Sequence, residues 1–105
     1  MPDIEEMNGD AAVLPEKKTR LKKPKLFKVL LHNDDFTTMD FVVFILEHVF
    51  ARSTAEAAAI MLKVHNEGVG IAGIYPYEIA MMKRDKATNF ARSREYPLLV
   101  TLEEE

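Results

Sequence analysis

The chain has 105 residues and no cysteine. Without cysteine it forms neither a disulfide nor a thiolate metal site, so any metal would have to be held by histidine and carboxylates alone. Long apolar runs are also missing, because the longest, from Phe41 to Leu46, is far shorter than a membrane span. Residues 1–15 lack the basic and apolar segments of a secretory signal. We therefore expect a cytoplasmic protein without membrane contact.

The net charge is −3, and acidic and basic residues are separated along the chain. Residues 1–15 hold four acids and no base, whereas residues 16–28 hold seven bases and one acid. The chain after Lys25 has eight basic against twelve acidic residues, hence a formal charge of −4. A compact nucleic-acid-binding protein is normally basic on its folded face, so this distribution argues against such a function for the folded part.

Composition divides the chain into two regions. Up to about Pro24 the sequence has few large apolar residues and dense charge, which cannot offset the entropy lost on ordering. We predict a disordered charged extension over residues 1–25 and one folded domain over residues 26–105. With 48% hydrophobic residues, the chain is able to bury a modest core.

The domain begins with a predicted strand and a predicted helix. The short apolar run from Leu26 to His32 ends at an Asn-Asp-Asp turn signal, which is typical of a strand. Thr37 or Thr38 then caps a helix that runs to about Phe50. Thr37, followed three residues later by Asp40, resembles a capping box with a short acid.

A second helix and a second strand follow. The helix opens at the capping box Ser53-Thr54-Ala55-Glu56 and extends through Asn66 to a predicted left-handed cap at Gly68. The segment from Val69 to Tyr75 is a predicted strand, and its two internal glycines mark bulges or the close passage of another backbone.

The remaining elements complete an α+β fold. Pro76 suits the first turn of a third helix from Tyr77 to about Arg92, and Leu98 to Leu102 form a third strand before the acidic residues 103–105. The order β-α-α-β-α-β predicts a small three-stranded antiparallel sheet packed against three helices.

The junction between the first strand and the first helix is rich in hydrogen-bond acceptors. Asn33, Asp34 and Asp35 stand there between two apolar segments. Turns and helix caps favour these residue types for backbone reasons alone. The same side chains also suit a small cation held beside an apolar cavity, so both interpretations stand at this point.

Several apolar residues share helix faces near this junction. Met39 and Val42 share a face at the start of the first helix, and Met61, Val64 and His65 share a face near the end of the second. If the two helices are neighbours, the four apolar side chains line one cavity, although the spacing fits an ordinary core as well. His65 alone also fits a structural residue near a helix C-terminus. Together with the turn, the cavity would have a polar rim and an apolar floor.

Such a rim and floor are compatible with a metal site, a catalytic site or a recognition pocket. No HxH, HxxxH or DxD spacing supports a metal site. No nucleophile stands in the sharp structural context that catalysis requires. The basic stretch over residues 17–28 lacks the interleaved aromatic residues of a nucleic-acid site. We expect no enzymatic activity, no cofactor, no metal and no nucleic-acid partner.

Three ordered motifs resemble the bacterial ClpS adaptor family. They are Lys28 to Val42 (KVLLHNDDFTTMDFV), Met61 to Gly68 (MLxVHxxG) and Pro97 to Glu103 (PLLxTLE). The likeness covers about residues 26–105, the whole predicted domain. The resemblance implies a non-enzymatic adaptor. Such an adaptor captures N-degron substrates, which begin with Leu, Phe, Tyr or Trp, and delivers them to the ClpA unfoldase of the ClpAP protease.

The resemblance also assigns roles position by position. The positions that hold the substrate's α-amino group are matched by Asn33, Asp34 and His65. The side-chain pocket and its rim are matched by Asp35, Thr37, Met39, Val42, Met61, Val64 and Leu98. The surface that docks the N-terminal domain of ClpA is matched by Glu78 and Lys83. Met39 matches a gatekeeper that disfavours β-branched first residues. The family's N-terminal extension is needed for delivery.

Two places depart from the family pattern. Thr38 stands where the family often has proline, and either residue fits a helix start. Met81 and Met82 stand beside Lys83, where a polar pair is expected. The docking surface therefore departs further from the family than the pocket does.

Overall fold

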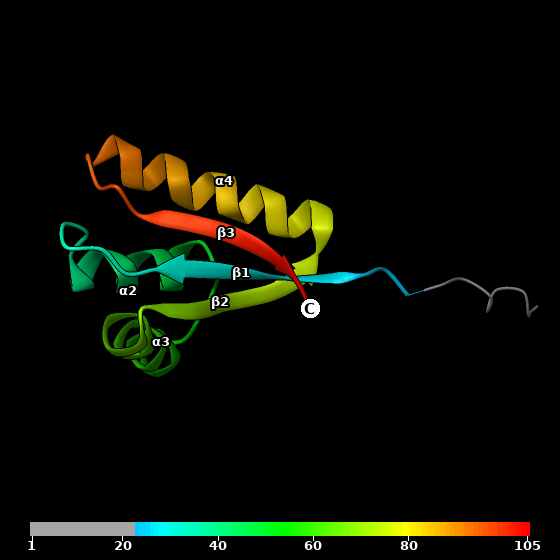
Figure 1. The fold of residues 1–105 in the computed structure, drawn as a ribbon, viewed down its shortest axis with the longest axis horizontal. Coiled ribbons are helices and arrows are strands. Elements are labelled where there is room, and N and C mark those ends of the chain that lie inside the picture. Colours follow the sequence, from blue (N-terminus) through cyan, green and yellow to red (C-terminus); the bar gives the residue numbers. More distant parts are fainter. Residues whose placement is uncertain (1–22) are drawn as a thin grey trace, which may run out of the picture.

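The structure is a computed structural model that describes residues 23–105. Most of the predicted extension, and most of the basic stretch within it, lies outside these residues. The elements are, in chain order, β1 (Leu26–His32), α2 (Met39–His48), α3 (Thr54–Glu67), β2 (Val69–Pro76), α4 (Tyr77–Ser93) and β3 (Leu99–Glu104) (Figure 1). The predicted β-α-α-β-α-β order is confirmed.

β1 is the middle strand of an antiparallel sheet with the order β2-β1-β3 (Figure 1). His32, the last residue of β1, pairs with both Val69 and Leu99, the first residues of its two neighbours. The turn that begins at Asn33 therefore lies at the end of the sheet where β2 and β3 start.

The pairing of β1 with β2 contains a bulge. Val29 pairs with Gly73 but Leu30 pairs with Ile71, so Ala72 is an extra residue on β2. This confirms the prediction that the glycines of this strand mark an irregularity. Bulges increase the local twist of the strand that carries them.

α3 packs closely on β2 because its first half is thin and a glycine faces it. Ala57 of α3 is fully buried. A Cβ atom at Gly70 would lie 2.8 Å from a methyl carbon of Val64. A side chain at Gly70 would therefore force Val64 to shift, and its Cβ would also lie 3.5 Å from the backbone carbonyl oxygen of Ile60, in agreement with the predicted close passage of another backbone.

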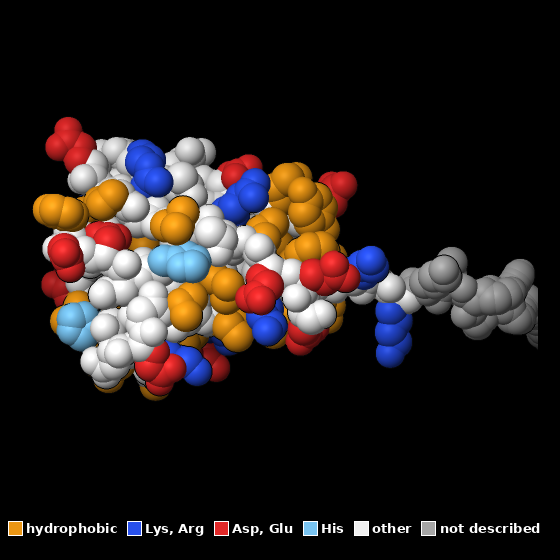
Figure 2. Space-filling view, viewed as in Figure 1, with side chains coloured by type: hydrophobic (Ala, Val, Ile, Leu, Met, Phe, Trp, Pro, Cys, Tyr) orange, Lys and Arg blue, Asp and Glu red, His pale blue; other side chains and the backbone are white. Residues whose placement is uncertain are grey.

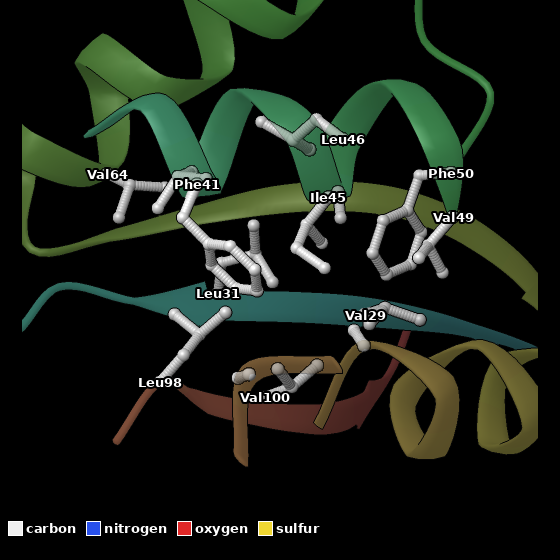
Figure 3. Packing of buried hydrophobic residues seen from close by; sticks show 14 of the residues in the cluster. Val29, Leu31, Phe41, Ile45, Leu46, Val49, Phe50, Val64, Leu98 and Val100 are labelled. Atoms are coloured by element: carbon white, nitrogen blue, oxygen red, sulfur yellow. The ribbon is translucent and has the colours of Figure 1, made fainter. Parts of the chain in front are cut away.

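The core lies between one face of the sheet and the helices (Figure 3). Val29 and Leu31 point from β1 toward Phe41 and Ile45 of α2. The largest fully buried side chains are Leu31, Ile45, Leu46, Leu98, Val29 and Val64. Burying each such side chain contributes about 1.5–3 kcal/mol to the hydrophobic driving force.

No helix of the described part covers the other face of the sheet, and hydrophobic side chains lie among charged ones on it (Figure 2). Val69, Ile71 and Leu99 are exposed there. This alternation of buried and exposed residues along the strands is expected when helices cover only one face of an antiparallel sheet.

The start of α2 differs from one prediction. Thr38, not Thr37, is the N-cap, and its hydroxyl oxygen accepts a hydrogen bond from the backbone N–H of Phe41 at 3.1 Å. The predicted capping box of Thr37 with Asp40 is wrong, because the hydroxyl of Thr37 donates to Asp34 instead. The alternative cap at Thr38 is confirmed.

β3 is shifted relative to its predicted bounds. It begins at Leu99 and continues to Glu104, two residues beyond the predicted end at Leu102. Glu103 pairs with Lys28 of β1 across the strands, and Glu104 lies 3.5 Å from Lys25. These opposite charges allow acidic residues to remain in the strand.

Candidate functional site

The turn after β1 is tied to the end of α3. The backbone N–H of Asn33 donates to the carbonyl oxygen of Gly68 at 2.9 Å. Gly68 caps α3 with a φ of 93°, a left-handed conformation that suits glycine, and its N–H donates to Val64. The same few contacts therefore hold His65, near the end of α3, beside the turn that carries Asn33.

The carboxylate of Asp34 closes this turn. Its Oδ1 accepts from the backbone N–H groups of Phe36 at 2.8 Å and Thr37 at 2.7 Å. Its Oδ2 accepts from the hydroxyl of Thr37 at 2.8 Å. Since each carboxylate oxygen offers about two acceptor positions, the donors within residues 23–105 fill Oδ1 and leave one position at Oδ2.

These contacts keep Asp34 ionised. Partial burial raises the pKa of its carboxyl group, but the backbone hydrogen bonds from Thr37 and Phe36, the Thr37 hydroxyl and the charge of Arg92 lower it more. The net pKa lies below the usual value for aspartate. The turn therefore presents a negative charge at neutral pH.

A cavity of about 340 Å³ opens between this turn, the start of α2 and the end of α3. Polar side chains of the turn and His65 contribute to its lining, and both helices add apolar side chains. The lining residues are Asn33, Asp34, Asp35, Phe36, Thr37, Thr38, Met39, Val42, Met61, Val64 and His65. All three predicted α-amino-binding residues, and every predicted pocket residue except Leu98, thus lie around one cavity.

The depth of the apolar lining varies. Val42 and Val64 are buried, with 6% and 2% of their surface exposed, so they belong to the floor. Met61 is half-buried, and Met39 is 44% exposed. Met39 therefore lies nearer the mouth, where a flexible side chain is able to adjust to what enters.

Two lining residues, Phe36 and Thr38, were not predicted. Phe36 is 74% exposed, and Thr38 caps α2 while it borders the cavity. Both stand inside the same motif between Asp35 and Met39. Their position inside this motif could have predicted that they line the cavity, because a turn that surrounds a cavity places most of its residues at the rim.

Leu98 lies in the core and not among the residues that line the cavity. Only 1% of its surface is exposed, and it points toward Leu31 (Figure 3). Arg92 holds the segment before it, because its Nη1 donates to the carbonyl oxygens of Tyr96 at 2.8 Å and Leu98 at 3.0 Å.

The cavity does not have the ligands of a metal site. Within residues 23–105 there is no group of three or more His, Asp or Glu side chains that could hold a metal ion. Most acceptor positions of Asp34 are already filled by N–H and O–H donors, which a cation would have to displace.

None of the helices in the described part is long and apolar enough to cross a membrane.

The two residues assigned to unfoldase docking both lie on α4 but differ in surroundings. Glu78 is exposed in the first turn of the helix. Lys83 is half-buried, and its Nζ donates to the carbonyl oxygen of Val49 at 2.9 Å and lies 5.3 Å from the centre of the Tyr75 ring. Met82 beside it is 64% exposed.

Comparison with known proteins identifies the family. The family model described as "ATP-dependent Clp protease adaptor protein ClpS" matches residues 22–101. The chain is 48% identical over 104 residues to the ATP-dependent Clp protease adapter protein ClpS of Desulfatibacillum aliphaticivorans, covering 99% of this chain and 98% of that one. It is 48% identical over 99 residues to the Bartonella quintana protein of the same name, covering 94% and 90%.

A solved structure extends the likeness to the fold. Agrobacterium tumefaciens ClpS2, solved bound to L-phenylalaninamide, superposes with a TM-score of 0.76 at 35% identity, covering 79% of this chain and all of that chain. The chain belongs to the ClpS family, the adaptor proteins of the ATP-dependent Clp protease.

Proposed function

We propose that this adaptor binds N-degron substrates by their first residue. The α-amino group lies against Asn33, Asp34 and His65, and the first side chain enters the cavity. The observation that carries this proposal is an acceptor-rich, negatively charged rim directly above an apolar floor. L-phenylalaninamide, the ligand of the Agrobacterium relative, combines a free amino group with an aromatic side chain in the same way.

The chemistry of a protein N-terminus fits this rim. An α-amino group has a reference pKa of about 7.7–8.0, so at neutral pH it is mostly an ammonium with three donors and no acceptor. The side-chain oxygen of Asn33 and the carboxylate of Asp34 accept from it. A neutral His65 ring nitrogen either accepts from the amine or donates to the first peptide carbonyl.

The same rim rejects a blocked N-terminus. Acetylation removes the charge and two of the three donors. The acceptors of Asn33 and Asp34 then lose their partners while the bound ligand keeps water away. An unpaired buried acceptor costs about 1–3 kcal/mol, and more when it is charged.

The first side chain supplies the apolar part of the binding free energy. Burying Leu or an aromatic ring contributes about 1.5–3 kcal/mol, and each hydrogen bond to a charged group contributes a similar amount. Ordering the peptide and losing its free motion take much of this back, so we expect affinity on the order of micromolar. Moderate affinity lets an adaptor release its cargo.

Met39 restricts what enters the cavity. A β-branched first residue such as Ile or Val carries an additional substituent close to its backbone, and this group meets Met39 near the mouth. Overpacking of this kind costs about 1–3 kcal/mol. Leu, Phe, Tyr and Trp branch further from the backbone, so they pass the mouth and fill the floor.

Delivery to the ClpA unfoldase of the ClpAP protease forms the second half of the proposal. The N-terminal domain of ClpA contacts α4 through Glu78 and Lys83. The hydrogen bond from Lys83 to Val49 fixes this part of α4 on the end of α2. The charged extension of residues 1–25 is the segment that ClpA engages during delivery, and residues 26–105 carry the substrate in the cytoplasm.

Fluorescence anisotropy with a peptide series tests substrate binding. Peptides that begin with Leu, Phe, Tyr or Trp should bind, whereas matched peptides that begin with Ile or Val should bind about 5- to 150-fold more weakly. The Met39→Ala variant should narrow that difference by strengthening the Ile and Val peptides. Equal binding of all first residues to the native chain would refute recognition of the first side chain.

A degradation assay tests delivery separately. Purified ClpAP should degrade a Leu-initiated reporter protein faster when the full chain is added, and removal of residues 1–25 should abolish this gain without changing peptide affinity. Glu78→Ala should weaken delivery but not peptide binding. A truncated chain that still delivers the reporter would disprove the role of the extension.

A further inference from the structure

Thr37 contacts both oxygens of the Asp34 carboxylate. Its backbone N–H donates to Oδ1 at 2.7 Å, and its hydroxyl donates to Oδ2 at 2.8 Å. The same residue lines the cavity. Two roles are thus available to Thr37. It either forms part of the wall against the ligand's side chain or fixes the carboxylate that faces the ligand's amine.

Hydrogen-bond counting separates these roles. A threonine hydroxyl has a single proton, and Thr37 donates this proton in its hydrogen bond to Asp34. The hydroxyl therefore donates nothing to a ligand in the cavity. The other two donors to Asp34 are both backbone N–H groups, and both bind Oδ1. Among the described residues, only the Thr37 hydroxyl is a hydrogen-bond donor to Oδ2.

Three hydrogen bonds hold the plane of the Asp34 carboxylate, and among the described residues the Thr37 hydroxyl is the donor that acts on Oδ2 directly. The terminal torsion of aspartate is broad and moves both oxygens together, so without the bond on Oδ2 only the two bonds on Oδ1 restrict this torsion and Oδ2 moves over a wider range. The remaining acceptor position of the site is on Oδ2, as described above. An ammonium ligand benefits fully from this acceptor only if Oδ2 is already oriented before binding, because the cost of ordering Oδ2 on binding is subtracted from the affinity.

We propose that Thr37 is a positioning residue, which fixes Oδ2 of Asp34 for the ligand's α-amino group through its hydroxyl. The inference rests on the proposed function, because it assumes that the ligand presents an amine. It makes the Asp34–Thr37 pair one functional unit, in which Thr37 determines how strongly any free N-terminus binds, whatever the first side chain.

Two conservative substitutions test the assignment. Thr37→Val keeps the shape but loses the hydroxyl, and Thr37→Ser keeps the hydroxyl but loses the methyl group. A positioning role predicts that Thr37→Val weakens a Leu-initiated peptide about tenfold, while Thr37→Ser stays within about twofold of the native chain. A wall role predicts the opposite order, with Thr37→Ser the weaker by about fourfold for a lost methyl contact.

The dependence on the peptide gives a further distinction. The loss in Thr37→Val should be equal for Leu-, Phe- and Trp-initiated peptides, because the amine is common to all three. If Thr37→Val does not fold, the pair Thr37→Ala and Thr37→Ser gives the same comparison, since these two variants differ only by the hydroxyl. Stronger binding by the serine variant supports the proposal, and equal binding by the pair overturns it.

Carbon-13 NMR of the Asp34 carboxyl group provides a readout without any ligand. Thr37→Val should raise the pKa of Asp34 relative to the native chain and Thr37→Ser should not, with Arg92, Asp35 and His65 left in place in both. An unchanged Asp34 titration in Thr37→Val would overturn the inference. Failure of the native chain to prefer a free N-terminus over an acetylated one would overturn the proposed function as well.

Discussion

The two ends of the domain use polar side chains in opposite ways. At the end where α2 stops and α3 starts, two cationic side chains donate hydrogen bonds to backbone carbonyl oxygens. Arg52 Nε donates to the carbonyl oxygen of Ala72, the bulge residue of β2, at 2.8 Å. Lys83 Nζ donates to the carbonyl oxygen of Val49, the C-cap residue of α2, at 2.9 Å. Both carbonyl oxygens lie where regular backbone pairing is interrupted.

At the other end, acceptors outnumber donors. The residues that line the cavity include Asp34 and Asp35, and no Lys or Arg is among them. Asp34 is held ionised, and its three hydrogen bonds leave one acceptor position at Oδ2. The acceptor surplus here contrasts with the two cations of the α2–α3 end, each of which donates to a backbone carbonyl oxygen.

This difference indicates which end stabilises the domain and which end binds. Side chains whose donors are already used on the backbone contribute to folding, whereas acceptors held next to an apolar cavity wait for a donor from outside. Substitutions at the cavity should therefore change binding most, and substitutions at the α2–α3 end should change stability most.

The largest effect is expected for Asp34→Ala. Removal of the carboxylate takes away a hydrogen bond to the charged ammonium and opens the turn, so a Leu-initiated peptide should bind about 10- to 100-fold more weakly. Fluorescence anisotropy measures this loss. Asp40→Ala is the matched control, because Asp40 is an exposed carboxylate of the next helix that does not line the cavity. Equal losses in both variants would mean that only the general negative charge matters.

Lys83→Met should have the largest effect on stability. It removes the hydrogen bond to Val49 and the cation over the Tyr75 ring, so the free energy of unfolding should fall by about 1–2 kcal/mol in urea denaturation. Lys86→Met, on an exposed part of the same helix, should change it by less than about 0.5 kcal/mol. Peptide affinity should stay the same in both. Weaker peptide binding by the folded Lys83→Met variant would break the separation of the two ends.

Ala51→Gly should stabilise the α2–α3 end. Ala51 has a φ of 54°, a left-handed conformation that costs a residue with a Cβ atom about 1–2 kcal/mol. Part of the gain is lost to the greater freedom of glycine in the unfolded chain, so the net increase should be about 0.5–1 kcal/mol. Ala59→Gly, in an exposed helical position, should instead destabilise by about 1 kcal/mol. If both variants lose stability, the strain at Ala51 is not significant.

The smallest effect is the pH dependence contributed by Asp34. Its pKa is lower in the folded chain than the usual value near 4, so its contribution to stability is present above that value and is lost as the pH falls through the folded pKa. The stability advantage of the native chain over Asp34→Asn should therefore shrink on acidification below about pH 4. Thermal unfolding between pH 7 and pH 3 measures it. A constant difference would show that the Asp34 bonds do not depend on its charge.

Local signals allowed most of the fold to be predicted. The capping box at Ser53 and Glu56 and the glycine cap at Gly68 depend on residues within one turn of each other, and both are present in the structure. The turn at Asn33 to Asp35 and the shared faces on α2 and α3 indicated a cavity, but their spacing fitted caps and an ordinary core as well, and the resemblance to a known family assigned them to a pocket. Patterns with a fixed local period are legible without knowledge of the fold.

The features that sequence could not settle depend on contacts between distant elements. The burial of Leu98 in the core depends on how the segment before β3 packs against β1, and the bond from Lys83 to Val49 joins residues 34 positions apart. The choice of Thr38 over Thr37 as the cap was open because both are good caps, and the carboxylate of Asp34 decided it. Both residues are threonine, so their side chains alone do not indicate which of them caps the helix.

Calorimetric titration with a Leu-initiated peptide and its acetylated twin tests the central claim most directly, because the two ligands share every side chain and differ only at the amine. We expect affinity on the order of micromolar for the free peptide and binding at least about tenfold weaker for the acetylated one. Equal affinity for the two peptides would contradict it, since the acceptor surplus around the cavity would then have no role in recognition.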